Sequence, residues 1–269
     1  CMGRRMAETT IFLTEQLIQN IPVRQWVLSF PIPLRYWMAR SPKLLTQIHK
    51  ITSRAISTHY RKLAKPNKGK IGEICLIQRF GSDLRLNVHL HMIFSEGIWD
   101  KAGIFHVTRG PTDQEVEKIV AKIKTKCLRL LLNLGYIQDD GQISTSTDAD
   151  DESDSIINKA LAAAIRANQL FKPNHKVPRL GQFDKQFEPK RKGPKCATID
   201  YFSLHANTYV AANDKKGLER LIGYVTRPSV SEARLSINSK GDVLYKLKNP
   251  FSDGTLFVSF TPLGRYRSS

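Results

Sequence analysis

Two histidines in an apolar run are the residues of this chain best suited to chemistry. His89 and His91 are separated by Leu90 within the segment 87–94, which has the composition of a buried β-strand. Because side chains alternate between the faces of a strand, both imidazoles project from one face while Leu90 points toward the core. Such a pair can hold one divalent metal ion, which is the reading we favour; the alternative is a pair of hydrogen-bonded structural histidines.

A second predicted strand lies just before the histidines and brings a candidate third ligand. The segment 71–80 also has strand character, and turn-forming residues follow it at 80–83. We therefore expect an antiparallel hairpin in which Gln78 lies beside His89 and His91. An amide oxygen and two imidazoles suit Mg²⁺ or Mn²⁺ and leave coordination positions for phosphate oxygens.

The charge of the chain indicates a polyanionic partner. It contains 42 Lys and Arg residues against 24 Asp and Glu, a formal net charge of +18 over 269 residues. The segment 139–154 holds seven of the acids and no Lys or Arg, so the remainder is more basic still. Nucleic acid is the expected partner. The alternative is a basic surface that is simply solvated.

The composition argues against a membrane or disulfide-rich protein. No apolar run reaches the ~18–20 residues that a membrane span requires, and the N-terminus lacks a signal-peptide pattern. The four cysteines (Cys1, Cys75, Cys127 and Cys196) are widely scattered, which is typical of a reducing compartment. We expect a soluble intracellular protein with one large or two small domains.

The order of predicted elements indicates a mixed fold. Amphipathic spacing predicts helices at 7–20 and 34–65, and alternation predicts strands at 23–30 and 198–211. A further helix begins with a capping box at Thr112–Glu115 and ends at Gly135. Asp214 caps a helix that extends to about residue 226, and turn signals beyond residue 230 predict a short antiparallel meander.

Two segments lack periodicity. Residues 139–155 are acidic and rich in Ser and Thr, which predicts a mobile loop. Residues 170–195 are strongly basic and contain Pro. This second segment either lies along a nucleic-acid backbone or is a surface excursion.

Tyr224 lies on a predicted helix in a position that could leave its hydroxyl free. In the predicted helix 215–226 the apolar stripe is formed by Leu218, Leu221, Ile222 and Val225. At 100° per residue Tyr224 lies about 60° from Leu221, on the flank of this stripe. Its hydroxyl can therefore lean over a sheet edge, although most aromatic residues in such positions only cover the core.

Several of these motifs, in this order, resemble the rolling-circle insertion-sequence transposases, especially the ISCR-like group. The resembling segments are Pro22–Pro31, Ile77–His91, Phe202–Ala206, Gly217–Pro228 and Asp253–Thr255. These transposases are HUH endonucleases, named for the His-hydrophobe-His motif that His89, Leu90 and His91 match.

The resemblance implies a fold and a domain organisation. The expected fold is α+β, a ferredoxin-like or RRM-like antiparallel sheet with helices packed on one side and a small C-terminal β-meander. The nuclease domain would span 7–230 with an insertion at about 139–196, and the meander would span 231–269. Residues 1–6 resemble the remnant of an N-terminal zinc-binding module, and the resembling transposases continue beyond the position of Ser269. We therefore expect a chain truncated at both ends.

The resemblance also implies roles for individual residues. Tyr224 would be the nucleophile that forms a 5′-phosphotyrosine, and His89 and His91 would be metal ligands. Gln78 occupies an upstream position where relatives can place a third ligand. Other relatives take that ligand one turn after the tyrosine, where this chain has Pro228 without a donor atom. Two-tyrosine relatives carry a second tyrosine where this chain has Arg220, so a single-tyrosine enzyme is expected.

The remaining expectations concern DNA and location. Arg79, Lys215, Lys216 and Arg227 are expected to contact DNA, and His205 is either a site residue or a structural histidine. The implied partner is single-stranded DNA at transposon ends, and the implied location is the bacterial cytoplasm, in association with the nucleoid. Two other readings stay open: a non-catalytic module that binds single-stranded nucleic acid, and a replication initiator or relaxase that uses the same chemistry.

Overall fold

The computed structural model describes residues 2–18, 20–65, 68–81, 84–138, 193–228, 230–250, 254–260 and 266–267. The predicted acidic loop and nearly all of the predicted basic segment fall between residues 139 and 192, outside the described residues. The described part is a mixture of helices and antiparallel sheets, which confirms the α+β class.

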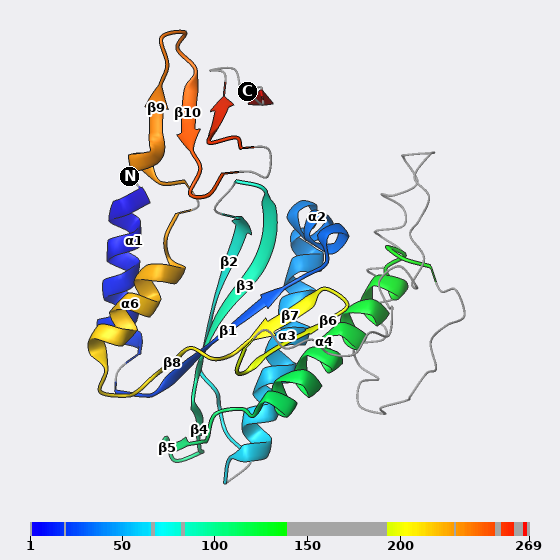
Figure 1. The fold of residues 1–269 in the computed structure, drawn as a ribbon. Helices are drawn as coiled ribbons and strands as arrows, with labels where there is room; N and C mark the ends of the chain where they lie inside the picture. The colour runs from blue at the N-terminus through cyan, green and yellow to red at the C-terminus, as the bar shows by residue number, and fades with distance from the viewer. Residues whose placement is uncertain are drawn as a thin grey trace.

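A six-stranded sheet forms the centre of the protein (Figure 1). Its main path runs in the order β2 (Glu73–Phe80), β3 (Leu86–Ser95), β1 (Val23–Ser29), β7 (Phe202–His205) and β6 (Cys196–Ile199). The short strand β8 (Tyr209–Val210) pairs with β1 beyond β7. All neighbouring strands are antiparallel, and β2 and β3 form the hairpin that the sequence predicted.

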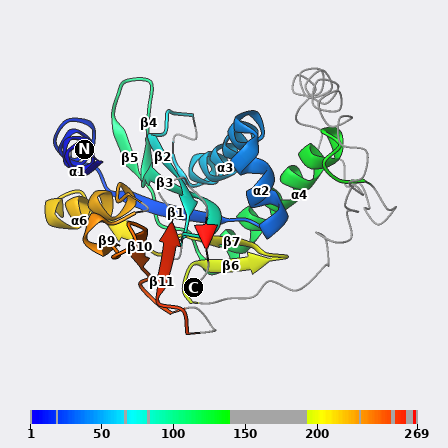
Figure 2. The ribbon, with the colours of Figure 1, turned by 90° about the horizontal axis from the view of Figure 1, so that it is seen from above.

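Three helices cover one face of this sheet: α2 (Ile32–Arg40), α3 (Pro42–Leu63) and α4 (Asp113–Asn133) (Figures 1 and 2). Trp26 and Leu28 of β1, and Phe30 just after its end, are fully buried in the core between this face and the helices. Leu90, between the two histidines, lies in the same core. The main hydrophobic core is therefore on the face that the histidines do not occupy.

Helix α4 begins and ends as its sequence predicted. The Thr112 hydroxyl accepts from the Glu115 backbone amide at 3.2 Å, and the Glu115 carboxylate accepts from the Thr112 amide at 2.7 Å. This reciprocal capping box satisfies two of the amides that a helix start leaves without partners. Gly135 ends the helix with a φ of 73°, a conformation that glycine adopts without steric cost.

The opposite face of the sheet is partly covered as well, which differs from the expectation of helices on one side. The helix α1 (Met2–Ile11), the π-helix η1 (Phe12–Leu17) and α6 (Lys215–Val225) lie there (Figures 1 and 2). A smaller core joins Val23, Ile93 and Val210 of the sheet to Leu218, Leu221 and Ile222 of α6. Because this end of the sheet is apolar on both faces, both faces must be covered.

Two predicted elements are divided in the structure. The helix expected at 34–65 is broken between α2 and α3, because Ser41 is extended and caps the new helix through a hydrogen bond from the Leu44 amide at 3.2 Å. Pro42 then occupies the first turn, where its missing N–H is tolerated. The strand expected at 198–211 is a hairpin followed by β8, since Asp200 and Tyr201 both adopt positive φ values, 45° and 67°. Positive φ at two successive residues forms a tight hairpin turn.

The C-terminal part forms a second, separate sheet. Strands β9 (Leu235–Ile237), β10 (Val243–Lys246), β11 (Phe257–Phe260) and β12 (Tyr266–Arg267) pair antiparallel in sequence order. The short helix η3 (Glu232–Arg234) leads into this sheet, and β4 (Gly97–Trp99) and β5 (Phe105–Val107) form a hairpin elsewhere. Among the helices of the described residues, none combines the length and apolarity needed to cross a membrane.

Candidate functional site

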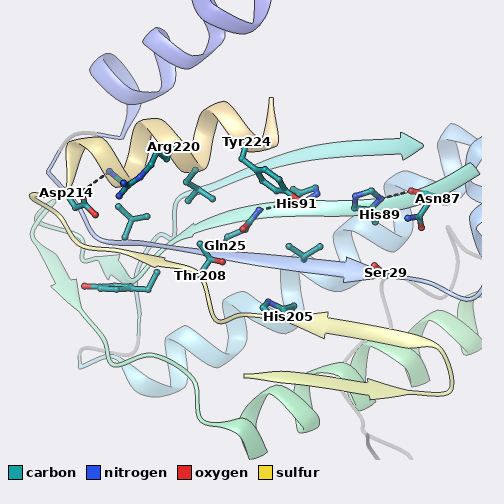
Figure 3. A pocket seen from close by; sticks show the side chains of 15 residues that line it. Gln25, Ser29, Asn87, His89, His91, His205, Thr208, Asp214, Arg220 and Tyr224 are labelled. Atoms are coloured by element: carbon teal, nitrogen blue, oxygen red, sulfur yellow. Dashed lines mark hydrogen bonds between the residues drawn. The ribbon is translucent and has the colours of Figure 1, made fainter. Parts of the chain in front are cut away.

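An open cleft of ≈ 720 Å³ lies between the uncovered part of the second sheet face and helix α6 (Figure 3). Its lining residues come from three regions that are distant in sequence: the first strand, the histidine strand, and the segment from β7 to α6. The side chains used below are Gln25, Val27, Ser29, Asn87, His89, His91, His205, Asp214, Arg220 and Tyr224. The fold thus brings both predicted histidines and the predicted tyrosine into one cleft.

The two histidines are neighbours on the floor of the cleft. In the β3–β1 register His89 is opposite Ser29 and His91 is opposite Val27. Their ring centroids are 4.9 Å apart, with an interplanar angle of 63°. Both imidazoles therefore project from one face of the strand, as the sequence predicted, and this is the face that carries α6.

Both imidazoles are neutral near pH 7. Burial and, to a smaller extent, the neighbouring His89 lower the pKa of His91 from 6.5 to about 4. Burial also lowers the pKa of His89. A neutral imidazole carries one lone pair, on the ring nitrogen without the proton, and a metal ligand needs this lone pair.

The hydrogen bonds of the two rings leave the same nitrogen open on each. Nδ1 of His89 lies 2.6 Å from the backbone oxygen of Asn87. Because a carbonyl oxygen only accepts, Nδ1 of His89 carries the proton and Nε2 carries the lone pair. Nδ1 of His91 is 2.8 Å from the side-chain amide of Gln25, so its Nε2 is also the nitrogen without a hydrogen-bond partner among the described residues.

These features fit a divalent metal ion held by two imidazoles. Metal-ligating histidines generally engage their second ring nitrogen in a hydrogen bond, as both rings do here. Among the described residues no group of three or more His, Cys, Asp or Glu side chains could hold a metal ion. A third ligand from these described residues would be an amide or hydroxyl oxygen, which suits Mg²⁺ or Mn²⁺ better than Zn²⁺.

Gln78 lies where the hairpin prediction placed it. Its register partner is His89, and its side-chain amide donates to the backbone oxygen of Val225 at 3.1 Å. This bond ties the second strand to the end of α6 and leaves the amide oxygen of Gln78 without a hydrogen bond to the described residues. Gln78 is not among the residues that line the cleft, so its role as a ligand stays a prediction.

Helix α6 presents Tyr224 to the cleft. Asp214 caps the helix by accepting from the Gly217 amide at 2.7 Å, and the apolar stripe of the helix is buried. Tyr224 lies on the flank of that stripe, 56 % exposed, with its ring centroid 6.0 Å from that of His91 and nearly perpendicular to it at 77°. The phenol is thus both solvent-accessible and next to the histidine pair (Figure 3).

Arg220, one helical turn before Tyr224, supplies the cationic side chain among the described residues that line the cleft. It is exposed and makes no hydrogen bond or ion pair with other described residues. Residues four apart on a helix lie on the same side, so the guanidinium and the phenol belong to one wall. From the sequence alone, Arg220 is notable only because two-tyrosine relatives carry their second tyrosine at this position.

The cations that the sequence proposed as DNA contacts do not line the cleft. Arg79 donates to the Ala39 backbone oxygen at 3.4 Å, on the side of α2. Lys215 pairs with Glu15 at 3.4 Å. Lys216 and Arg227 are exposed at the beginning of α6 and just beyond its end. Any contact they make with DNA would be outside the cleft.

His205 and several polar residues complete the floor. His205 lies across Val27 from His91, because both histidines are register partners of Val27 on opposite sides. Sequence reasoning did not identify Gln25 or Ser29 as site residues. A signal was present, since both alternate with the core residues Trp26 and Leu28 and therefore face away from the core.

The fold and cleft are those of an α+β protein with a candidate metal-binding and nucleophilic site. Residues 72–263, more than two thirds of the chain, match the family model described as "Putative transposase". The chain therefore belongs to this transposase family. The matched range includes His89, His91 and Tyr224, whereas Gln25 lies before it. Comparisons with curated proteins and with solved structures gave no match.

Proposed function

We propose that this transposase cleaves and rejoins single-stranded DNA, with Tyr224 as the nucleophile. The observation that carries the proposal is the position of the accessible phenol, whose ring is 6.0 Å from that of His91 in the same open cleft. Membership of a transposase family supports DNA as the substrate. The formal charge of +18 is consistent with a polyanionic partner.

The residues that would hold Mg²⁺ or Mn²⁺ are His89 and His91 through Nε2, with the amide oxygen of Gln78 as the proposed third ligand. When bound, the ion would polarise the scissile phosphate and stabilise the charge that develops on the departing oxygen. The imidazoles are suited to this task because burial keeps both neutral.

In the proposed step the phenolic oxygen of Tyr224 attacks phosphorus in line with the departing 3′ oxygen. The phenol loses its proton, the new bond joins the tyrosine to the 5′ phosphate, and the released 3′ oxygen gains a proton. One phosphodiester replaces another, so the reverse reaction is equally accessible. Attack by the 3′ hydroxyl of a different strand would then transfer the strand without nucleotide hydrolysis.

The cations have separate proposed roles. Arg220 would contact a phosphate inside the cleft, close to the one attacked. Arg79, Lys215, Lys216 and Arg227 would contact flanking phosphates along the strand outside it. His205 lies on the floor, where it would contact the strand beside the histidine pair. Contacts with phosphates position the strand and make binding salt-dependent, but carry little sequence information.

A covalent adduct tests this proposal. The full chain is mixed with Mn²⁺ and single-stranded oligonucleotides taken from transposon ends and labelled at the 3′ end, and the products are separated under denaturing conditions. A protein-linked label is expected with the wild type and absent with Tyr224→Phe. The matched control is Tyr201→Phe, because Tyr201 is 64 % exposed and does not line the cleft.

Three results would contradict the proposal. An adduct that persists in Tyr224→Phe would assign the nucleophile to another residue. Salt-sensitive binding without any adduct would favour a non-catalytic module. Adducts formed with plasmid-origin strands but not with transposon ends would instead identify a replication initiator or relaxase.

A further inference from the structure

The side chain of Gln25 is hydrogen-bonded to His91 at the floor of the cleft. Its amide is 2.8 Å from Nδ1 of His91, and the two residues are 5 % and 3 % exposed. Gln25 is on β1, the strand that pairs with the histidine strand. The buried bond therefore connects the candidate ligand to a neighbouring strand and not to its own.

The orientation of this amide determines the position of the single proton on a neutral imidazole. With the amide nitrogen toward His91, the nitrogen donates, Nδ1 accepts, and the proton is on Nε2. Nε2 then faces the cleft as a donor and cannot ligate a metal. After a half-turn of the amide the oxygen accepts from Nδ1–H, and Nε2 carries the lone pair instead. The nitrogen and oxygen of a primary amide have nearly the same shape, so both arrangements fit the same space.

We propose that Gln25 is the positioning residue of the metal site, and that its amide presents its oxygen to Nδ1 of His91 whenever His91 ligates a divalent cation. His89 reaches the same tautomer by a simpler route, since its Nδ1 faces a backbone oxygen that can only accept. The two ligands thus differ: the tautomer of His89 is fixed by the backbone, and that of His91 depends on a side chain that can turn. This inference rests on the proposed role of His91 as a ligand.

The rotation couples the metal site to the rest of the cleft. Gln25 itself lines the cleft, so the half-turn that gives its oxygen to His91 directs its NH₂ group away from that ring. The NH₂ group is then available to donate to an acceptor such as a phosphate oxygen of the strand. Cation binding would in this way change a hydrogen-bonding group on the floor of the cleft.

Two substitutions separate the orienting role from simple packing. In Gln25→Glu the carboxylate only accepts, so the variant holds the proton on Nδ1 without any rotation. In Gln25→Leu the bond to His91 is lost while a side chain of similar size remains. Gln114→Glu and Gln114→Leu are the matched controls, because Gln114 is exposed near the beginning of α4.

The primary readout is the tautomer of His91, measured on protein with ¹⁵N-labelled histidine by long-range ¹H–¹⁵N correlation. No DNA is present, and the signals of His91 are assigned with His91→Asn. Adding Mg²⁺ to the wild type is expected to move the proton from Nε2 to Nδ1. In Gln25→Glu the proton is expected on Nδ1 even without Mg²⁺. Isothermal titration with Mg²⁺ should give an affinity at least equal to wild type for Gln25→Glu, and about 10-fold to 100-fold weaker for Gln25→Leu.

The tautomer of His91 and the Mg²⁺ affinities test the proposed role of Gln25 without depending on DNA cleavage. A proton that stays on Nε2 of His91 in the presence of Mg²⁺, or equal Mg²⁺ affinities for the Glu and Leu variants, would overturn the inference. Absence of Mg²⁺ binding in a folded wild type would also overturn it. An adduct at Tyr224 with no dependence on Gln25 would leave the proposed function intact. A Gln25-dependent tautomer without any adduct would leave the inference intact and remove the proposed function.

Discussion

The side-chain amide of Gln78 donates to the backbone oxygen of Val225 at 3.1 Å, and Val225 is the residue that follows Tyr224. The strand that faces His89 therefore also holds the end of the helix that carries the phenol. Strand β2 thus contacts both the histidine strand β3 and the end of α6. The bond from Gln78 therefore helps to set the distance between Tyr224 and the histidine pair. Gln78 would thus act on both parts of the site.

Gln78 variants should separate these two effects. Gln78→Leu removes the donor and the oxygen, whereas Gln78→Glu keeps an oxygen and cannot donate. The rate of adduct formation is expected to fall by about 5-fold in both variants, the equivalent of one hydrogen bond. Mg²⁺ affinity, measured by titration, is expected to weaken in the Leu variant only, because a carboxylate ligates Mg²⁺. Wild-type rates in Gln78→Glu would show that the Val225 bond does not position Tyr224.

Arg220→Gln tests the phosphate contact inside the cleft. Removing the cation should weaken binding of a single-stranded oligonucleotide to Tyr224→Phe protein by about 10-fold, since hydrogen bonds to charged groups contribute about 1.5–3 kcal/mol. The slope of log affinity against log salt should decrease by about 0.7, the value for one phosphate contact on a single strand. Fluorescence anisotropy at several salt concentrations measures both quantities.

Lys101→Gln is the control for the loss of one positive charge. Lys101 is exposed in the turn between β4 and β5 and does not line the cleft. A change in affinity and slope equal to that of Arg220→Gln would mean that Arg220 acts only through the net charge of the protein.

Glu96→Gln is expected to destabilise the fold. Glu96 is 2 % exposed and accepts from the Arg24 guanidinium at 2.8 Å and from the Tyr60 hydroxyl at 2.9 Å. Breaking a buried ion pair leaves an uncompensated buried charge, so the free energy of unfolding should decrease by about 3–5 kcal/mol. Urea denaturation followed by circular dichroism measures the change. The control Glu8→Gln should change it by less than about 0.5 kcal/mol, because its partner Arg4 is 83 % exposed.

The capping box of α4 should make stability depend on acid. The Arg109 guanidinium is the main cause that lowers the pKa of Glu115 from 4.5 to about 2, and the Thr112 amide contributes. Because the folded-state pKa is the lower one, the stabilisation is fully present above about pH 4.5 and is lost as the pH falls toward 2. We expect this shift to contribute about 2 kcal/mol to the free energy of unfolding. This value already allows for the solvent that screens the half-exposed Arg109.

Thermal unfolding between pH 2 and pH 7 measures this dependence. Glu115→Gln should flatten the part of the curve below pH 4.5, because an amide does not titrate. The control is Glu219→Gln, which removes an exposed carboxylate of α6. An unchanged acid transition in Glu115→Gln would assign the acid sensitivity to other carboxylates.

The sequence by itself determined the local features of the site. The His-Leu-His spacing fixed both imidazoles on one face of a strand, because alternation is a property of any strand. The apolar stripe of helix 215–226 fixed Tyr224 on its flank, and the Thr112–Glu115 box fixed the start of α4. The β2–β3 hairpin, and with it the pairing of Gln78 and His89, was also predictable because its strands are joined by a short turn.

Only the tertiary structure decided which distant segments meet these residues. The pairing of β1 with β3 sets Gln25 beside His91, and the placement of α6 on the histidine face sets Tyr224 and Arg220 at the same cleft. Local periodicity indicates which side of an element is apolar. It does not select the neighbour of a strand, because a strand with an alternating pattern can pair with several other strands and in several registers. The choice among them depends on burying both cores at once. For this reason the contact between Gln25 and His91, unlike the outward direction of the Gln25 side chain, could be recognised only in the fold.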